Sequence, residues 1–127
     1  MKKIFIVTSN RADYGIMSNL IHLLKKEKNN RFKLIVTGSH LEKKYGYTIN
    51  EILADKINPD HIIKVSIKTT DPKKNIESIT SYMKNFSKFF YKQKPDLLIL
   101  LGDRYEIFSI AVSAFIHKIP IVHLYGG

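Results

Sequence analysis

Hydrophobic and polar positions follow two alternating periods along the 127 residues of the chain. Runs of consecutive apolar residues are typical of strands covered on both faces. Such runs lie at 3–9, 32–38, 61–67, 96–102 and 120–127. Between these runs the apolar residues recur every three or four positions, which is the spacing of an amphipathic helix. The pattern therefore predicts strands and helices in alternation.

Each predicted helix has one apolar face. The residues of these faces, in chain order, are Met17, Leu20, Ile21 and Leu24; Ile49, Ile52 and Leu53; Ile76, Ile79, Met83, Phe86 and Phe90; and Ile107, Ile110, Ala111 and Ala114. Thr48 precedes the second helix and is a residue type that caps helices. The third helix, 75–93, ends before Pro95, because proline disfavours helical backbone at the preceding residue. We interpret its aromatic run 86–91 as core, with a subunit surface as the alternative.

Strands that alternate with helices through short connections form a parallel sheet built from right-handed β–α–β units. We therefore predict an α/β fold, a three-layer Rossmann-like domain over 1–127. The sequence reaches Gly127 directly after the last predicted strand. Doubly wound nucleotide-binding domains usually continue beyond that point, so we expect an incomplete domain. A complete five-stranded flavodoxin-like domain is the alternative.

Composition narrows the class of protein. Hydrophobic residues make up 44% of the chain and charged residues 25%, as in ordinary soluble domains. The absence of cysteine excludes disulfides and thiolate metal sites and fits a reducing compartment. No histidine pair has metal-ligand spacing, and no apolar run approaches the roughly 18–20 residues of a membrane span. We therefore expect a cytoplasmic protein with no metal, no cofactor and no membrane contact.

The formal net charge of +10 raises the question of an anionic partner. The lysines are dispersed, however, and most lie where predicted helices end or loops begin. At such places cations complement the helix dipole and keep a protein soluble. No zinc-finger, RNP or recognition-helix pattern accompanies them, so solvated faces are favoured over a nucleic-acid surface. The alternative, an electrostatic nucleic-acid binder, predicts steeply salt-dependent DNA association.

Three polar clusters follow predicted strands: "SNRADYG" at 9–15, "GSHLEKKYG" at 38–46 and "GDRYE" at 102–106. In open α/β sheets, ligands bind outside the carboxyl ends of the strands, where the strand order reverses. All three clusters fall at such ends. The sequence therefore predicts a ligand site at this edge of the sheet.

The first cluster has neither the G-x-G-x-x-G fingerprint nor a Walker loop. This argues against a dinucleotide-binding domain and against a P-loop NTPase. The cluster does place Arg11 beside a helix N-terminus, where free backbone N–H groups and a guanidinium together suit a diphosphate. Alternatively, Asp13 caps the helix and Arg11 pairs with it.

In the third cluster, Asp103 projects from a strand end and has the chemistry of a general acid or base. It is equally suited to cap a helix that starts near Tyr105. Glu106 is interpreted as structural, in a first turn where the helix dipole favours acids. Among the histidines, His40 follows a strand end and is placed to touch a ligand, whereas His123 faces either a pocket or the core.

The segments that carry these clusters closely resemble one enzyme family. They are "TSNRADYGIM", "VTGSHLEKKYGYTINEI" and "PDLLILLGDRYEIFSIAVSAFIHKIPIVHLYGG". The family is that of the hydrolysing UDP-N-acetylglucosamine 2-epimerases of sialic-acid biosynthesis, and the similarity runs through the whole chain. Sister enzymes that act on UDP-N,N'-diacetylbacillosamine in legionaminic-acid synthesis share the same motifs. The sugar is therefore left open.

The resemblance implies the first half of a glycosyltransferase-B-like fold, in which two Rossmann-like domains enclose the active site. It implies a reaction without metal or nicotinamide. A base removes the C2 proton while UDP leaves C1, and water adds to the resulting 2-acetamidoglucal to give N-acetylmannosamine. The full-length parent is expected to be a dimer or tetramer that takes a UDP-sugar. This chain alone, without the second domain, is expected to be inactive; a non-catalytic nucleotide-binding module is the other reading.

Residue by residue, the resemblance makes Asp103 a catalytic acid, a role compatible with helix capping. Arg104 matches a contact on the uridine or phosphate side, and His40 matches a pocket histidine. The residues that match the lining of the UDP site are Arg11, Ala12, Asp13 and Gly15.

The end of the chain departs from the family pattern. Tyr125 stands where many members have a catalytic glutamate, and it is taken here as a substrate-binding position. Other members keep an acid just after the two glycines, which corresponds to the position following Gly127. The identity of the second acid is therefore open.

Overall fold

The computed structural model describes residues 1–65 and 71–125, which form a parallel sheet of five strands between two layers of helices. The strand order is β3-β2-β1-β4-β5. The strands are β1 Lys2–Thr8, β2 Asn30–Thr37, β3 His61–Ile63, β4 Leu97–Leu101 and β5 Ile121–Leu124. Every adjacent pair is parallel, so the predicted α/β fold is confirmed.

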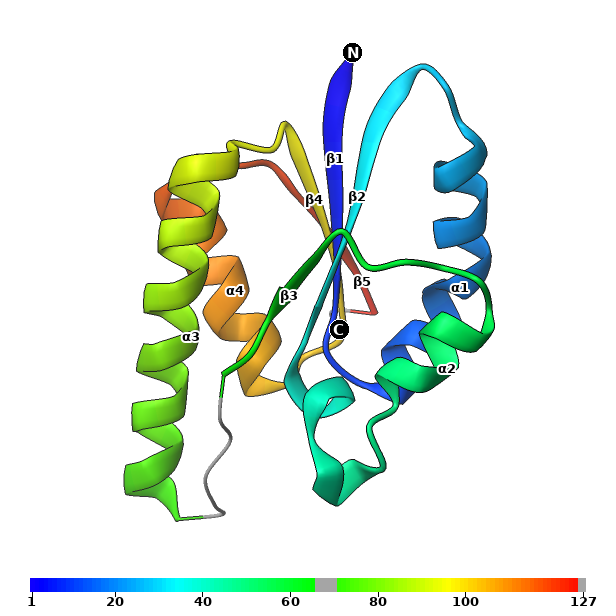
Figure 1. Cartoon of the computed structure of the whole chain (residues 1–127). Helices are drawn as coiled ribbons and strands as arrows, with labels where there is room; N and C mark the ends of the chain where they lie inside the picture. Colours follow the sequence, from blue (N-terminus) through cyan, green and yellow to red (C-terminus); the bar gives the residue numbers. More distant parts are fainter. Residues whose placement is uncertain (66–70, 126–127) are drawn as a thin grey trace.

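The helices cover the sheet in pairs. They are α1 Arg11–Lys26, α2 Ile49–Ala54, α3 Pro72–Gln93 and α4 Tyr105–Ile116. Figure 1 shows α1 and α2 on one face of the sheet and α3 and α4 on the other. Two short 3-10 turns, Gly38–Leu41 and Lys43–Tyr45, lie between β2 and α2. This is the predicted three-layer arrangement.

Two hydrophobic clusters fill the spaces between the layers. Phe5 and Val7 of β1 pack with Phe86 and Phe90 of α3. Ile6 of the same strand belongs to the other cluster, together with residues of α1 and α2. Successive residues of β1 therefore point to opposite cores, which explains why its sequence is a continuous apolar run.

The longest helix differs from its prediction in start and in face. It begins at Pro72 rather than at 75, because the Asp71 side chain caps it by accepting from the backbone N of Lys73 at 3.1 Å. Its buried residues are Ser78, Tyr82, Phe86 and Phe90, which recur every four positions. Ile76 lies off this stripe and is exposed, so its assignment to the core was wrong.

Three smaller predictions are also wrong, or hold only in part. Thr48 precedes α2 but makes no capping hydrogen bond, since its own backbone is helical. The third strand ends at Ile63 instead of 67, and residues 66 and 67 lie outside the described part. In the aromatic run 86–91, Phe86 and Phe90 are core as expected, whereas Tyr91 is exposed.

The strand order reverses between β1 and β4. The chain leaves β1 through α1 toward β2 on one side, and leaves β4 through α4 toward β5 on the other. A reversal of this kind opens a crevice at the carboxyl ends of the two strands. The three polar clusters of the sequence begin at or next to those ends.

A close backbone approach ties the end of β2 to the end of β1. Gly38 has a φ of +66°, and a Cβ at this position would lie 2.5 Å from the carbonyl oxygen of Ser9. The backbone N of Ser39 donates to the same oxygen at 2.8 Å. Only glycine accommodates both the left-handed backbone and this contact.

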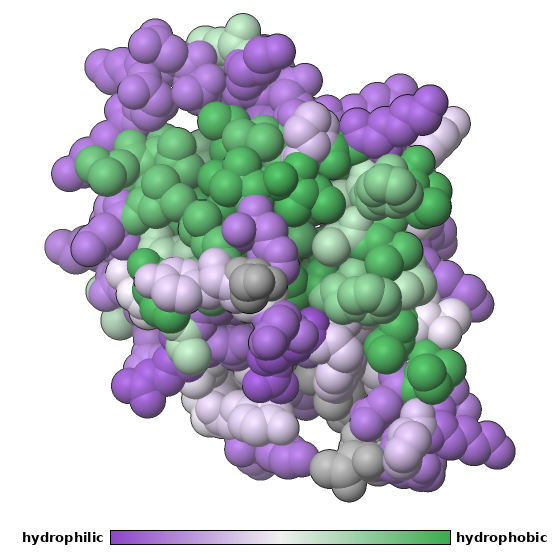
Figure 2. All heavy atoms as spheres, turned by 180° about the vertical axis from the view of Figure 1, so that it is seen from behind, coloured by the Kyte–Doolittle hydropathy of each residue, from purple (hydrophilic) through white to green (hydrophobic). Residues whose placement is uncertain are grey.

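Apolar side chains also gather on the outside of the molecule. Figure 2 shows them over much of its back. The large exposed residues of α1, α4 and β5 are Ile16, Leu23, Phe108, Phe115, Ile116 and Val122. Extended apolar surface of this kind is typical of faces that pack against further protein. Among the helices of the described residues, none is long and apolar enough to cross a membrane.

The packing predicts different costs for two phenylalanines. Phe86→Ala removes a fully buried ring and is expected to lower the free energy of unfolding of the chain by about 3–5 kcal/mol. Phe115→Ala, the matched control on the exposed face, is expected to change it by less than about 0.5 kcal/mol. Urea denaturation followed by circular dichroism measures both. Equal losses for the two variants would contradict the described core.

Candidate functional site

A cleft of about 370 Å³ lies at the carboxyl edge of the sheet, where the strand order reverses. Its lining residues are Asn10, Arg11, Ala12, Ser39, Tyr45, Thr48 and Arg104. They come from all three polar clusters and from the segment before α2. A larger hollow, of about 580 Å³, lies at the opposite, amino end of β1 and β2, beside Lys3 and Arg31. The carboxyl edge is the functional edge in parallel sheets, so the smaller cleft is the candidate site.

The turn from β1 into α1 is built on a buried carboxylate. Asn10 is the N-cap of α1, and its side chain accepts from the backbone N of Asp13 at 2.8 Å. Asp13 closes the reciprocal bond to the backbone of Asn10. The same carboxylate accepts from the hydroxyl of Thr8 and from both the backbone N and the hydroxyl of Ser9. Asp13 therefore sits beneath the cleft rather than in its wall.

Burial raises the pKa of Asp13 above its ordinary value, and the hydrogen bonds from Thr8, Ser9 and Asn10 work against that rise. Four donors around one carboxyl group suit its ionised form. The negative charge also lies at the N-terminus of α1, which the helix dipole favours.

His40 is fully buried between two threonines. Its Nε2 lies 2.9 Å from the Thr8 hydroxyl, and its Nδ1 lies 2.9 Å from the hydroxyl of Thr48. Burial lowers the pKa of His40 to about 4, so the ring is neutral at pH 7. Because the Thr8 proton goes to Asp13, Thr8 accepts from His40 Nε2–H, and His40 Nδ1 accepts from Thr48.

The result is a chain of hydrogen bonds with one direction. Thr48 in the cleft wall donates to His40, His40 donates to Thr8, and Thr8 donates to Asp13. His40 therefore does not reach the surface in this arrangement. The cleft residue that His40 contacts is Thr48, and the role of His40 toward a ligand stays a prediction.

Arg11 projects from the first turn of α1, beside Ala12. Its Nε forms an ion pair of 3.1 Å with Glu51 of α2, and the two side chains are 74% and 45% exposed. The alternative pairing with Asp13 is therefore not formed. Arg11 also borders a second hollow, of about 370 Å³, which Gly15 lines. Arg11 and Ala12 thus lie in the candidate cleft, and Gly15 lies one helical turn away.

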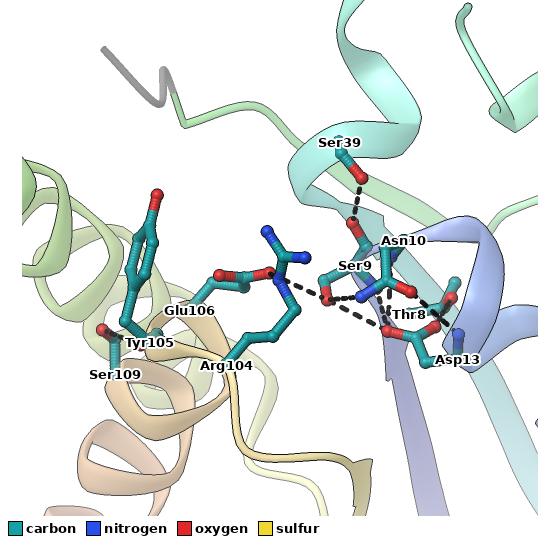
Figure 3. Close-up of polar contacts among 9 residues, drawn as sticks. All are labelled: Thr8, Ser9, Asn10, Asp13, Ser39, Arg104, Tyr105, Glu106 and Ser109. Atoms are coloured by element: carbon teal, nitrogen blue, oxygen red, sulfur yellow. Dashed lines mark hydrogen bonds and ion pairs between the residues drawn. The ribbon is translucent and has the colours of Figure 1, made fainter. Parts of the chain in front are cut away.

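The turn after β4 presents two charged side chains. Gly102 has a φ of +93°, which lets the chain leave the strand sharply. Asp103 is exposed and makes no capping bond, because Arg104 occupies the N-cap position of α4. Arg104 Nε lies 2.7 Å from Oε1 of Glu106 (Figure 3). The capping role considered for Asp103 is therefore not observed, and its exposed carboxylate has no partner among residues 1–65 and 71–125.

β5 ends beside this turn. His123 is exposed, and its Nε2 lies 2.5 Å from the carbonyl oxygen of Gly102, so that nitrogen carries the proton. Tyr125 follows with a left-handed backbone at φ 55° and is exposed. Tyr125 does not line the cleft in this structure, and Gly126 and Gly127 lie outside the described residues.

The structure thus brings Arg11, Ala12 and Arg104 together in one cleft, with Asp103 beside Arg104. Two guanidinium groups near the N-termini of two helices are chemically suited to an anion with several oxygens, such as a diphosphate. In the described residues no group of three or more acidic or histidine side chains is arranged to hold a metal ion.

Sequence reasoning missed several residues of this edge. Asn10 as N-cap was readable from its position three residues before Asp13. Ser39 and Tyr45 were quoted within the second cluster but not singled out, and Thr48 was considered only as a helix cap, since nothing in their spacing separates a cleft wall from an ordinary loop.

Comparisons with known proteins bear on this site. The family model described as UDP-N-acetylglucosamine 2-epimerase matches residues 22–127. The chain is 39% identical over its whole length to polysialic acid biosynthesis protein P7 of Escherichia coli. It is 37% identical to a hydrolysing UDP-N,N'-diacetylbacillosamine 2-epimerase of Legionella pneumophila. It spans 32% and 34% of these two relatives, about a third of their length.

Solved structures share the fold. A crystal structure of a UDP-N-acetylglucosamine 2-epimerase matches with a TM-score of 0.84 at 23% identity, over 96% of this chain and 32% of that one. The Neisseria meningitidis enzyme bound to UDP-GlcNAc matches with a TM-score of 0.79 at 21% identity, over 95% and 31%. At these identities the likeness supports the architecture alone.

The buried imidazole predicts a pH dependence of stability. Between pH 6.5 and 4 the unfolded chain binds a proton at His40 that the folded chain excludes. The stability contributed by the neutral ring is therefore complete above pH 6.5 and falls as the pH is lowered, by about 3 kcal/mol at pH 4.

Urea unfolding at pH 7.5 and pH 4.5 measures this loss. His40→Gln is expected to remove most of it, while His22→Gln, on the half-buried flank of α1, is expected to follow the wild type. Identical pH dependence in the wild type and in His40→Gln would contradict a buried neutral His40.

Proposed function

The chain belongs to the UDP-N-acetylglucosamine 2-epimerase family, and from that premise we propose that it is the first nucleotide-sugar-binding domain of a hydrolysing UDP-sugar 2-epimerase. The observation that carries the proposal is the cleft in which Arg11 of α1 and Arg104 before α4 face the same space. Cations at this edge of the sheet suit the diphosphate of a UDP-sugar.

The proposed substrate is UDP-N-acetylglucosamine. A base removes the proton from C2 of the sugar, the electron pair forms the C1–C2 double bond, and UDP leaves C1 with the bonding pair. Water then adds across the double bond of the 2-acetamidoglucal, giving N-acetylmannosamine with inverted C2. Asp103 is the proposed acid–base residue, since its exposed carboxylate lies next to Arg104 and has no partner in the described part of the chain. The chemistry as written needs no metal and no nicotinamide.

The remaining predicted site residues take indirect or peripheral places in this proposal. Ala12 lies in the first turn of α1, where backbone N–H groups point out of the helix toward the cleft. Asp13 and His40 support the cleft from beneath, and Gly15 borders the neighbouring hollow. Tyr125 is proposed to meet the sugar end of the substrate from the tip of β5.

The parent protein is proposed to be longer than this chain. The relatives are about three times its length, so a second domain would face this one in a glycosyltransferase-B arrangement. The apolar residues on the outside of α1, α4 and β5 would then pack against the rest of the domain or against a second subunit in a dimer or tetramer. The absence of cysteine is compatible with the proposed cytoplasmic location.

A second candidate substrate is UDP-N,N'-diacetylbacillosamine. The observation in its favour is the 37% identity to the Legionella pneumophila enzyme, which nearly equals the 39% identity to the Escherichia coli polysialic acid protein. The proposed pathway class is surface-glycan synthesis in both cases. Product analysis of the full-length protein with each UDP-sugar decides between the two.

The first test concerns binding. In the full-length protein, Arg11→Ala is expected to weaken UDP about tenfold, equivalent to about 1.4 kcal/mol, because one charge-assisted contact to the diphosphate is lost. Isothermal titration calorimetry measures the dissociation constant. Arg31→Ala, an arginine at the opposite end of the sheet, is the control and is expected to leave the constant unchanged. Equal effects of the two variants would argue against the site.

The second test concerns the chemical step. Asp103→Asn in the full-length protein is expected to lower kcat about a hundredfold or more while UDP still binds, because an amide cannot exchange the proton. The isolated 127-residue chain is expected to show no turnover of either UDP-sugar. Turnover by the isolated chain, or full activity of Asp103→Asn, would contradict the proposed assignment.

A further inference from the structure

Glu106 is a charged residue in an unusual position. It lies in the first turn of α4, directly under the turn that carries Asp103 and Arg104, and its side chain is only 1% exposed. Its Oε1 accepts from Arg104, whereas its Oε2 is buried and has no hydrogen-bond partner among the described residues. Acidic side chains are rarely buried in this way unless they are paired. The contact with Arg104 therefore matters more than an ordinary surface ion pair.

Arg104 supplies the only described cation against this carboxylate. The Nε of Arg104 lies 2.7 Å from Oε1, the short distance of a charge-assisted hydrogen bond. The helix dipole adds a favourable field, because Glu106 is at the N-terminus of α4. Removing either partner would leave the other without its counter-charge.

The geometry of this pair also fixes where the guanidinium points. A guanidinium is planar and has five N–H donors, of which the contact uses the one on Nε. The Arg104 side chain is 51% exposed, and its two terminal nitrogens have no recorded partner in the described part of the chain. Figure 3 shows them directed away from Glu106. The buried carboxylate thus leaves the bidentate end of Arg104 free.

A second, weaker contact borders the carboxylate. The hydroxyl of Ser9, at the end of β1, lies 3.4 Å from Oε1 of Glu106 and 3.0 Å from Oδ2 of Asp13. Ser9 has one hydroxyl proton, which serves the nearer Asp13 more strongly. Glu106 therefore lies between the carboxyl end of β1 and the start of α4, at the crevice where the strand order reverses.

The other arginine of the cleft is held differently. Arg11 pairs with Glu51, and the two side chains are 74% and 45% exposed, so this ion pair adds little and is screened by salt. Arg104 instead has one side of its guanidinium anchored on a buried group. Of the two cations, Arg104 is the one whose orientation the protein sets in advance.

We infer that Glu106 is a positioning residue: its buried carboxylate holds Arg104 by Nε so that the two terminal nitrogens face the diphosphate of the nucleotide. The inference rests on the proposed function, in which Arg104 contacts a UDP-sugar. It assigns Glu106 no contact with substrate and no proton transfer. A guanidinium fixed before binding loses less conformational freedom when the ligand arrives, which raises affinity.

A double-mutant cycle in the full-length protein tests this inference. The variants are Glu106→Gln, Arg104→Ala and the combination, and the measured quantity is the dissociation constant of UDP by calorimetry. Glu106→Gln is expected to weaken UDP about tenfold when Arg104 is present and less than twofold when Arg104 is already alanine. Glu77→Gln, on the exposed face of α3, is the matched control and is expected to change nothing.

A merely structural role for Glu106 predicts a different pattern, in which UDP weakens equally with and without Arg104. That pattern, or an unchanged constant in a folded Glu106→Gln protein, overturns the inference. If Glu106→Gln does not fold, Arg104→Lys serves instead, since lysine keeps the charge but has no Nε to anchor. Lysine is expected to bind UDP as weakly as alanine, within threefold, and wild-type affinity in Arg104→Lys overturns the inference.

The wild-type protein separates this inference from the proposed function. If wild type fails to bind UDP, the proposed function is wrong and the inference falls with it. If wild type binds UDP and the cycle shows no coupling between Glu106 and Arg104, the proposed function stands and only the inference is lost.

Discussion

The buried carboxylate of Asp13 is the interaction on which the rest of the ligand edge depends. It accepts from the end of β1 and from the start of α1, and through the Thr8 hydroxyl it also holds His40, which belongs to the turn after β2. The turn from β1 into α1 and the sequence-distant turn after β2 therefore meet around one negative charge. A buried charge is costly unless it is fully hydrogen-bonded, and the four donors around Asp13 meet that requirement. The cleft wall at Thr48 is therefore held by this hydrogen-bond network as well as by hydrophobic packing around Ile49 and Ile52.

At this edge of the sheet, the charged side chains differ in how deeply they are buried. Asp13 and Glu106 lie inside, while Arg11 and Arg104 extend outward. An anion that approaches the cleft meets guanidinium groups first. Of the two buried carboxylates, Glu106 holds Arg104, whereas Asp13 holds the turn between β1 and α1, and Arg11 pairs instead with the more exposed Glu51. This layering is compatible with a family whose substrates carry a diphosphate, and it leaves Asp103 as the acidic group exposed beside Arg104.

The sequence was sufficient to predict the order of strands and helices, but not which polar side chains are buried or which partners they contact. Apolar runs predicted the strands because β1 and β4 are covered on both faces, and strand ends predicted where the polar clusters would meet. The contacts of Glu106, the burial of His40 and the pairing of Arg11 with Glu51 depend on neighbours from other elements. Local spacing carries no information about such neighbours. The apolar face of α3 was misjudged at Ile76, because the residues that the helix buries recur every four positions from Ser78 and Ile76 lies off that stripe.

The hydrogen-bond direction between Thr48 and Asp13 has a consequence for ligand selection. A threonine hydroxyl has one proton, and Thr48 gives it to His40, so toward the cleft this side chain offers only lone pairs. Arg11 and Arg104 line the same cleft, and their guanidinium groups offer only N–H donors. A ligand therefore needs acceptor oxygens where it meets the arginines and a hydroxyl or amide proton where it meets Thr48. A group that carries oxygens alone would suit the arginines but leave the lone pairs of Thr48 without a donor.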